Sequence, residues 1–366
     1  MSTSILFSPI KIGSVEIKNR FVRSATHDFM AEEDGSISER QLALYRQLAQ
    51  GEVGLIISGH AYVLPSGKAS PRQIAIYDDK FIPGLKELVK VVHQTESRLF
   101  LQLSHAGRQT KEKICGCQPL APSAVYEPVY QVMPREITIE EIEQVIEAFI
   151  QAAKRAKEAG FDGLQLHCAH GYLLSSFLSP YTNRRQDEWG GSLENRAKVI
   201  LEILRGIKKK INHDFPIIVK LNSSDYLPNG LEVEEAAKVA QMLEAEGLAA
   251  IEVSGGSAEA GKGSMWPGVR PEEEEGYFVP AAKFIKKIIK IPVIGLGGLR
   301  TFRVMERLVA SGEIDLVSMS RPFIREPDLI IKFKRKEVSA SQCISCNKCF
   351  NPRGIACAEI KKEKLI

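Results

Sequence analysis

The sequence predicts an α/β protein folded as a (β/α)8 TIM barrel, with a hairpin before the barrel and a short cysteine-rich extension after it. Eight short apolar runs recur along the 366 residues, and most are followed by an amphipathic segment of helical length. Strand and helix alternating eight times is the pattern of this barrel. A doubly wound open sheet is the alternative, but eight units and the lack of an early GxGxxG motif argue against it. The expected strands cover residues 21–26, 53–61, 98–106, 163–169, 216–224, 249–256, 291–298 and 315–322.

The segments between and before these strands fit the same architecture. Residues 140–160 place apolar side chains on one helical face, and residues 194–211 form a second segment of helical character. Residues 5–19 have the pattern of a short hairpin that turns at Gly13-Ser14. We expect this hairpin to cap the floor of the barrel.

Two long connections and the C-terminal end stand apart from the regular repeat. The connection at residues 107–137 is rich in proline and cysteine, and long ordered loops are often functional. The connection at residues 256–277 contains glycine, tryptophan and four consecutive glutamates, and we expect it to form part of a lid. The predicted domains are a barrel at residues 1–335 and a cysteine-rich extension at residues 336–366.

Composition limits the classes of function. The chain is 44% hydrophobic, which is sufficient for a large core, and 49 basic against 45 acidic residues give a net charge of only +4. So weak a charge does not predict a nucleic-acid partner. No apolar stretch approaches the ~20 residues of a membrane span, and the N-terminus lacks the pattern of a signal peptide. We therefore expect a cytoplasmic protein without a membrane partner, whose seven cysteines stay reduced.

Two of the apolar runs end abruptly in polar side chains, which predicts an enzyme. The first run ends with Gln102 and His105, and the second with His167, His170 and Tyr172. The carboxyl ends of barrel strands meet at the mouth, where this fold carries its chemistry. The two later histidines could be zinc ligands, acid–base groups or hydrogen-bond donors to a substrate carbonyl. Because the sequence fixes no third zinc ligand, catalysis is the favoured interpretation.

The seventh and eighth strands indicate a phosphate site. The seventh ends in Gly297-Gly298, and Ser320-Arg321 ends the eighth. Loops at these positions of a TIM barrel frequently bind phosphate through backbone amides. Glycine lets the backbone approach an anion, and an arginine adds a charge-assisted hydrogen bond.

Four cysteines near the C-terminus have a spacing typical of a metal centre. The spacing is C-x2-C-x2-C-x7-C, and four thiolates suit a [4Fe–4S] cluster or a structural zinc ion. Free thiols are the third possibility. Two further cysteines, Cys115 and Cys117, are interpreted as loop thiols. The candidate ligands are Cys343, Cys346, Cys349 and Cys357.

Several motifs together resemble the Old Yellow Enzyme family of flavin oxidoreductases. The resemblance covers about residues 5 to 335 with the motifs in the expected order. It implies a TIM barrel that binds FMN noncovalently and reduces activated alkenes with NADH or NADPH. The motifs that carry it lie at residues 101–108, 160–180, 182–196 and 318–329.

The resemblance also assigns roles to individual residues. Lys220 stands where the family usually has an arginine near the flavin, and a cation there stabilises the anionic reduced ring. Gly297, Gly298, Ser320 and Arg321 match the grip on the phosphate, although glycine is more usual at the position of Ser320. The residues that match contacts to the flavin ring are Ser24, Ala25, Thr26, Gly59 and Gln102.

For the reaction, the resemblance implies that His167 and His170 hold the carbonyl of an unsaturated small molecule. Reduced flavin then delivers hydride to the β carbon, and Tyr172 protonates the α carbon as a general acid. His27 departs from the cysteine that one subgroup has at its position, so the substrate class is the least determined feature.

The cysteine motif resembles that of the iron–sulfur branch of the family, which includes 2,4-dienoyl-CoA reductase and trimethylamine dehydrogenase. The last gap of the motif is shorter here than in that branch. Those relatives continue into nucleotide-binding domains that this sequence lacks. A cluster here would therefore exchange electrons with a separate electron-donor protein, beside or in place of NAD(P)H, or would be a vestigial or structural element. The resemblance also implies a homo-oligomer. The alternatives are an amine dehydrogenase or demethylase of the same branch, and a noncatalytic electron-transfer subunit.

Overall fold

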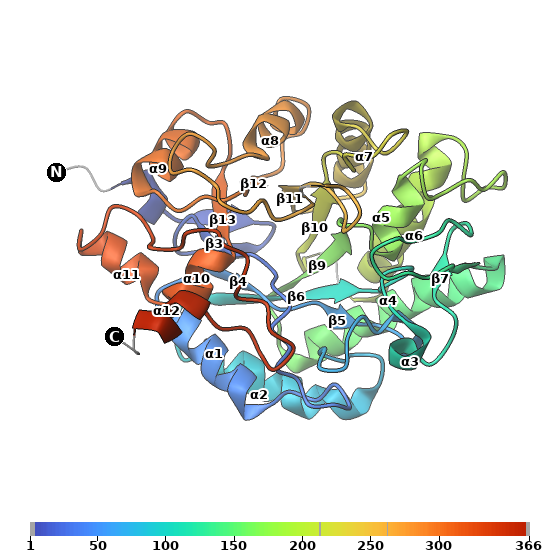
Figure 1. Cartoon of the computed structure of the whole chain (residues 1–366), viewed down its shortest axis with the longest axis horizontal. Helices are drawn as coiled ribbons and strands as arrows, with labels where there is room; N and C mark the ends of the chain where they lie inside the picture. Colours follow the sequence, from blue (N-terminus) through green and yellow to red (C-terminus); the bar gives the residue numbers. More distant parts are fainter. Residues whose placement is uncertain (1–3, 212–213, 262, 364–366) are drawn as a thin grey trace.

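Eight parallel strands close into a barrel, as the sequence predicted (Figure 1). The computed structural model describes residues 4–211, 214–261 and 263–363. The sheet closes because β13 pairs with β3 and β4 pairs with β6, so the open-sheet alternative is wrong. A short strand, β5 (Ala61–Tyr62), adds beside β6. The barrel strands are β3 (Phe21–Arg23), β4 (Leu55–Ile57), β6 (Arg98–Ser104), β9 (Gly163–Cys168), β10 (Ile217–Asn222), β11 (Ala250–Ser254), β12 (Val293–Gly295) and β13 (Leu316–Met319).

Amphipathic helices surround the barrel and bury its outer face. The predicted helices at 140–160 and 194–211 are confirmed as α4 (Ile139–Ala159) and α6 (Leu193–Lys210). A capping box begins α4, and Gly160 ends it with a left-handed φ of 91° that favours glycine. The other helices are α1 (Glu39–Gln50), α2 (Ile82–Val92), α3 (Glu112–Cys115), α5 (Leu173–Leu178), α7 (Val233–Ala245), α8 (Val279–Lys286), α9 (Phe302–Ala310), α10 (Arg321–Arg325), α11 (Leu329–Lys334) and α12 (Ala358–Glu363).

The predicted N-terminal hairpin is also confirmed, and it closes the floor of the barrel. Strands β1 (Ile10–Ile12) and β2 (Val15–Ile17) pair antiparallel around a turn in which Gly13 has a φ of 56°. Ile12 and Ile17 are fully buried among side chains that point inward from the lower half of the barrel. This floor layer consists of Val22, Leu55, Ile57, Phe100, Ile218, Ala250, Ile294 and Leu316.

The next layer inside the barrel is polar. Side chains along a strand alternate between inside and outside, so on β3, β6, β10, β11 and β13 the residue two places after a floor residue again points inward and is polar, and Gln165 is its counterpart on β9. We call the resulting set the polar layer. All six side chains are buried, and hydrogen bonds among them satisfy most of their polar atoms. The polar layer consists of Ser24, Gln102, Gln165, Lys220, Glu252 and Ser318.

The C-terminal extension packs back onto the mouth of the barrel. Its backbone bonds to the loop after β12, where Ser341 N donates to Arg300 O at 2.9 Å and Phe302 N donates to Ser339 O at 2.9 Å. Ile355 N donates to Asp28 O, which ties the extension to the loop after β3. Figure 1 shows the extension running beside the carboxyl ends of the strands. The predicted ranges also include residues 1–3, 212–213, 262 and 364–366, which lie outside the described residues.

Over the part of the chain that the structure describes, no helix combines the length and the apolar character needed to cross a membrane.

Candidate active site at the barrel mouth

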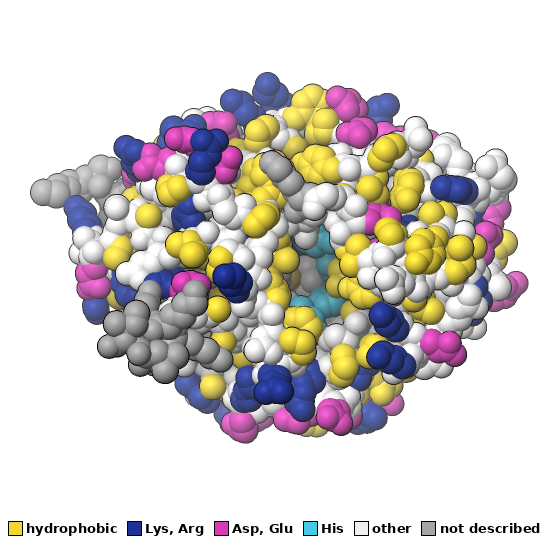
Figure 2. Space-filling model, in the orientation of Figure 1, with side chains coloured by type: hydrophobic (Ala, Val, Ile, Leu, Met, Phe, Trp, Pro, Cys, Tyr) yellow, Lys and Arg dark blue, Asp and Glu magenta, His cyan; other side chains and the backbone are white. Residues whose placement is uncertain are grey.

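A cavity of about 440 Å³ opens at the carboxyl ends of the strands. Figure 2 shows it as a hollow in the centre of this face with histidine side chains at its bottom. Its size falls in the range of cofactor and substrate pockets. It contains twelve of the thirteen residues predicted for catalysis and flavin binding. These lining residues are Ser24, Ala25, Thr26, Gln102, His167, His170, Tyr172, Lys220, Gly297, Gly298, Ser320 and Arg321.

The thirteenth predicted residue, Gly59, is not part of the cavity lining. Its backbone N–H donates to Tyr45 Oη at 2.8 Å. An added Cβ at this position would meet Thr26 O at 3.0 Å, so close packing of two loops accounts for the glycine. The following residue, His60, lines the cavity instead.

His105 also differs from its expected place at the mouth. It is 1% exposed and lies behind the cavity, where Gly107 N donates to its Nδ1 at 3.1 Å and Ser66 Oγ lies 3.3 Å from its Nε2. Strand β6 ends at Ser104, so His105 already belongs to the loop and does not follow the inward–outward alternation.

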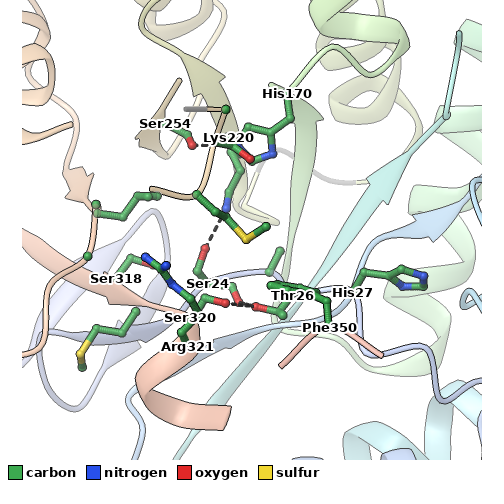
Figure 3. A pocket seen from close by; sticks show the side chains of 18 of the residues that line it. Ser24, Thr26, His27, His170, Lys220, Ser254, Ser318, Ser320, Arg321 and Phe350 are labelled. Carbon is green, nitrogen blue, oxygen red and sulfur yellow. Dashed lines mark hydrogen bonds between the residues drawn. The ribbon is translucent and has the colours of Figure 1, made fainter. Parts of the chain in front are cut away.

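His167, His170 and Tyr172 form the centre of the site. The ring centroids of His167 and Tyr172 lie 4.5 Å apart, and those of His167 and His170 lie 5.2 Å apart. His170 has a left-handed φ of 64°, which turns its side chain toward Ser254 Oγ, 2.7 Å from its Nε2 (Figure 3). The backbone is held there because His170 N donates to Asn222 Oδ1 at 3.1 Å. His167 Nδ1 is buried without a hydrogen-bond partner.

Burial keeps the histidines of the cavity neutral at pH 7. It lowers the pKa of His167 well below the ordinary value, and the nearby His170, His60 and Lys220 lower it further. The pKa of His170 is lowered for the same reasons, burial first. Burial raises the pKa of Tyr172, so its hydroxyl retains its proton. The site therefore offers neutral hydrogen-bond donors together with one proton-bearing phenol.

We expect the free energy of unfolding to decrease as the pH falls from 6.5 to about 4. Burial lowers the pKa of both His60 and His105 to about 4, whereas the unfolded chain takes up these protons near pH 6.5. Each histidine then contributes stability above pH 6.5 that is lost on acidification, on the order of 3 kcal/mol at pH 4. Urea unfolding at several pH values measures this loss.

A His105→Gln variant should show a flatter pH dependence than the wild type. A His93→Gln variant is the control, since the side chain of His93 is 34% exposed on the surface beside Asp162. Equal slopes for the wild type and His105→Gln would contradict the assignment.

One histidine of the site, His60, was missed by the sequence reasoning. His27, noted there only as the replacement of a cysteine, also lines the cavity. The ring of His60 lies 5.2 Å from that of Tyr172 and 4.9 Å from that of His27. The Gln73 amide is oriented by Ala69 N, which donates to its Oε1 at 2.7 Å, so its Nε2 faces both Nδ1 and the backbone oxygen of His60 at 3.1 Å. Ser104 Oγ also lies 3.0 Å from His60 Nδ1, so this nitrogen belongs to a buried hydrogen-bond network.

The proposed phosphate end of the cavity is built from the loops after β12 and β13. Gly297 and Gly298 have φ values of 122° and 73°, and a Cβ on Gly297 would meet two backbone nitrogens at 2.8 Å. Ser320 Oγ lies 2.7 Å from Thr26 Oγ1 (Figure 3). Arg321 is partly engaged by the protein, because its Nη1 donates to Trp266 O at 2.8 Å and Asn347 Oδ1 at 2.5 Å.

The loop between β11 and α8, expected as part of a lid, contributes seven residues to the cavity wall. Each of its four glutamates pairs with an arginine, although Glu272 and Glu273 remain exposed to solvent. Glu275 is fully buried and accepts from Thr301 Oγ1 at 2.6 Å, while Glu272 pairs with Arg303. Trp266 stacks on Tyr277 with 4.4 Å between ring centroids, which fixes the middle of the loop.

The four C-terminal cysteines of the predicted motif share one small cavity, which we call the cysteine pocket. Arg321 lines both this pocket and the main cavity, and Arg325 Nη1 lies 3.7 Å from Cys357 Sγ. In residues 4–211, 214–261 and 263–363, no group of three or more His, Cys, Asp or Glu side chains is placed to hold a single metal ion. The lining cysteines are Cys343, Cys346, Cys349 and Cys357.

Residues 5–339 match the family described as NADH:flavin oxidoreductase / NADH oxidase. The chain is 42% identical over 346 residues to an NADH oxidase from Thermoanaerobacter brockii, covering 93% of this chain and 52% of that protein. It is 37% identical over 325 residues to an NADPH dehydrogenase from Geobacillus sp. (strain WCH70), covering 88% and 92% of the two chains.

Solved structures give the same relationship. A 2-naphthoyl-CoA reductase in complex with 2-naphthoyl-CoA aligns with a TM-score of 0.89 and 32% identity, over 94% of this chain and 54% of that one. An old yellow enzyme homologue from Zymomonas mobilis aligns with a TM-score of 0.81 and 27% identity, over 97% of both chains. The chain thus spans about half the length of the NADH oxidase and of the naphthoyl-CoA reductase, and nearly all of the shorter relatives.

Proposed function

The chain belongs to the NADH:flavin oxidoreductase / NADH oxidase family, and from this premise we propose that it is an FMN-dependent ene-reductase. With FMN bound, NADH or NADPH would supply the electrons, and the protein would reduce an activated carbon–carbon double bond. Family membership confirms the resemblance drawn from the motifs. The observation that carries the proposal is the placement of His167, His170 and Tyr172 around one cavity that also contains Lys220.

The residues present fit an FMN. Gln102 Nε2 donates to Gln165 Oε1 at 2.7 Å, while Gln102 Oε1 forms no hydrogen bond within the described part of the chain and remains open to a ring N–H. Lys220 provides a cation in the cavity wall. Gly297, Gly298 and Ser320 would receive the phosphate, with Arg321 beside them. When bound, FMN would supply the hydride.

The protein side chains would perform the remaining chemistry on the substrate. His167 and His170, as neutral donors, would hold the carbonyl oxygen of an unsaturated ketone, aldehyde or thioester as negative charge develops on it. Tyr172 would then donate its proton to the α carbon. The buried aromatic surroundings of these groups would exclude water during the transfer.

Anaerobic titration of the purified protein with NADH or NADPH tests this function. We expect flavin absorbance that bleaches with the nicotinamide and returns when 2-cyclohexenone is added. If trimethylamine reduces the flavin and the enone does not reoxidise it, the result would favour amine oxidation. If dithionite reduces the flavin but NADH and NADPH do not, a separate donor protein would supply the electrons. Protein that neither contains nor takes up flavin would overturn the proposal.

We further propose that the extension at residues 336–366 holds a [4Fe–4S] cluster in the cysteine pocket. A cluster of four irons separates its thiolates more widely than one ion does, so a shared cavity is the relevant support. Arg321 and Arg325 would offset the negative charge of the thiolates. A structural zinc ion is the competing occupant.

A Cys349→Ser variant is expected to lose the broad iron–sulfur absorbance and most of the bound iron while retaining FMN. Cys349 is the most buried of the four cysteines, so its loss removes an inner ligand. Iron, zinc and flavin contents per chain are measured for the wild type, Cys349→Ser and Cys117→Ser, a loop control. Zinc in the wild type, or unchanged iron in Cys349→Ser, would contradict the cluster.

A further inference from the structure

A buried carboxylate lies at the centre of the barrel, and the proposed chemistry gives it no role. Glu252 on β11 has no exposed side-chain surface and does not line the cavity. Lys220 lies between it and the cavity, with Nζ 3.2 Å from Glu252 Oε2. We propose that Glu252 is a positioning residue: it fixes Lys220 and, by balancing its charge, lowers the reduction potential of the bound flavin. This inference rests on the proposed function.

Four side chains from four other strands converge on this carboxylate. Ser24 and Ser318 donate to Oε1 at 2.8 and 2.7 Å, and Gln165 donates to Oε2 at 2.8 Å. Together with Lys220 they saturate the two oxygens. Burial by itself would raise the pKa of Glu252, but Lys220 and these three hydrogen bonds lower it overall, so the group is an anion.

Lys220 is held as firmly as its counter-ion. Its Nζ also donates to Ser24 Oγ at 2.7 Å (Figure 3), and that hydroxyl in turn donates to Glu252. A lysine normally moves on a flexible stem. Here two contacts on the floor side of the cavity fix its ammonium group, so it cannot move up to follow a ligand.

The same carboxylate sets the direction of an amide chain that reaches the cavity. Because a carboxylate only accepts, Gln165 must turn its NH2 group toward Glu252 and its carbonyl toward Gln102. Gln102 then donates its own NH2 to Gln165 at 2.7 Å and presents its carbonyl to the cavity. Glu252 therefore determines which end of Gln102 a flavin meets.

The consequence for a flavin follows from the charge of the pair. A cation beside the ring stabilises the negative charge that the ring carries after reduction, which raises its potential. A carboxylate 3.2 Å behind that cation replaces a single charge by a dipole, whose field decreases more steeply with distance. The pair therefore stabilises the reduced ring less than an isolated cation would, and the flavin remains a stronger reductant.

A Glu252→Gln variant tests the inference through the flavin midpoint potential, measured by spectroelectrochemistry on the holoprotein. Glutamine keeps the shape and removes the charge. We expect the preference for reduced over oxidised flavin to increase at least tenfold, which is a rise of about 30 mV for a two-electron couple. A Ser318→Ala variant removes one hydrogen bond to the same carboxylate without changing charge, and should shift the potential far less.

A purely structural Glu252 would leave the potential unchanged in Glu252→Gln while lowering the melting temperature, and that result overturns the inference. If Glu252→Gln does not fold, Lys220→Gln is compared with the double variant Lys220→Gln/Glu252→Gln. The double variant should have the higher potential, since it lacks the unbalanced anion; equal potentials would also overturn the inference. A wild type that takes up no flavin would instead remove the proposed function together with the inference.

Discussion

Replacing Tyr172 with phenylalanine should slow alkene reduction by about 10²–10⁴-fold, the usual contribution of a general acid. Burial raises the pKa of Tyr172 and keeps it protonated, and its ring lies 4.5 Å from that of His167, one of the proposed carbonyl donors. Reduction of the flavin by nicotinamide does not use this proton and should keep its rate. Stopped-flow absorbance measures the two half-reactions separately.

A Tyr226→Phe variant is the matched control, because Tyr226 is 45% exposed and lies outside the cavity. It should match the wild type in both half-reactions. If Tyr172→Phe slowed both half-reactions equally, its role would be in binding or packing. If it slowed neither, the proton would come from another group, such as His60, whose ring lies 5.2 Å from that of Tyr172.

An Arg185→Met variant should lose about 2–4 kcal/mol of unfolding free energy, because it leaves two buried carbonyl oxygens without their hydrogen-bond donor. The guanidinium of Arg185 is 6% exposed and donates to Asp187 from Nε at 3.0 Å. Its Nη1 also donates to Ile137 O at 2.7 Å and Pro122 O at 3.2 Å. One side chain thus joins the loop after β6 to the loop after β9.

Urea denaturation of Arg185→Met and Arg184→Met gives a matched comparison. Arg184 is the exposed neighbour, and its Nε makes one contact, to Tyr181 O at 3.3 Å. Its replacement should change the free energy of unfolding by less than about 1 kcal/mol. Similar losses of unfolding free energy in both variants would show that the buried guanidinium of Arg185 is not the source of the stability.

The barrel could be predicted because its strands leave a local signal. Buried parallel strands are nearly continuous apolar runs, so β6 and β9 are visible as LFLQL and GLQLH without knowledge of their neighbours. The hairpin was visible for a similar reason, since its turn carries Gly13. Polar side chains at strand ends located the mouth, and twelve of thirteen predicted residues lie around one cavity.

The missed features depend on partners that lie far away in the sequence. Glu252 stands in an ordinary strand, and only closure of the barrel brings Ser24 and Ser318 to it from 228 and 66 residues away. His60 is a single histidine after a glycine, and its role depends on the orientation of Gln73. His105 was misplaced because the sequence does not mark where β6 ends and alternation stops.

The closed floor determines how ligands enter and leave the cavity. Because the hairpin and the layer of apolar side chains above it fill the lower half of the barrel, ligands have access only from the mouth in the part of the chain that the structure describes. The nicotinamide and the alkene would both need the face of the flavin, in a single chamber of about 440 Å³. In a shared chamber, each would have to leave before the other enters. The protein would then follow a double-displacement cycle through a single entrance. An excess of either the nicotinamide or the alkene would inhibit binding of the other.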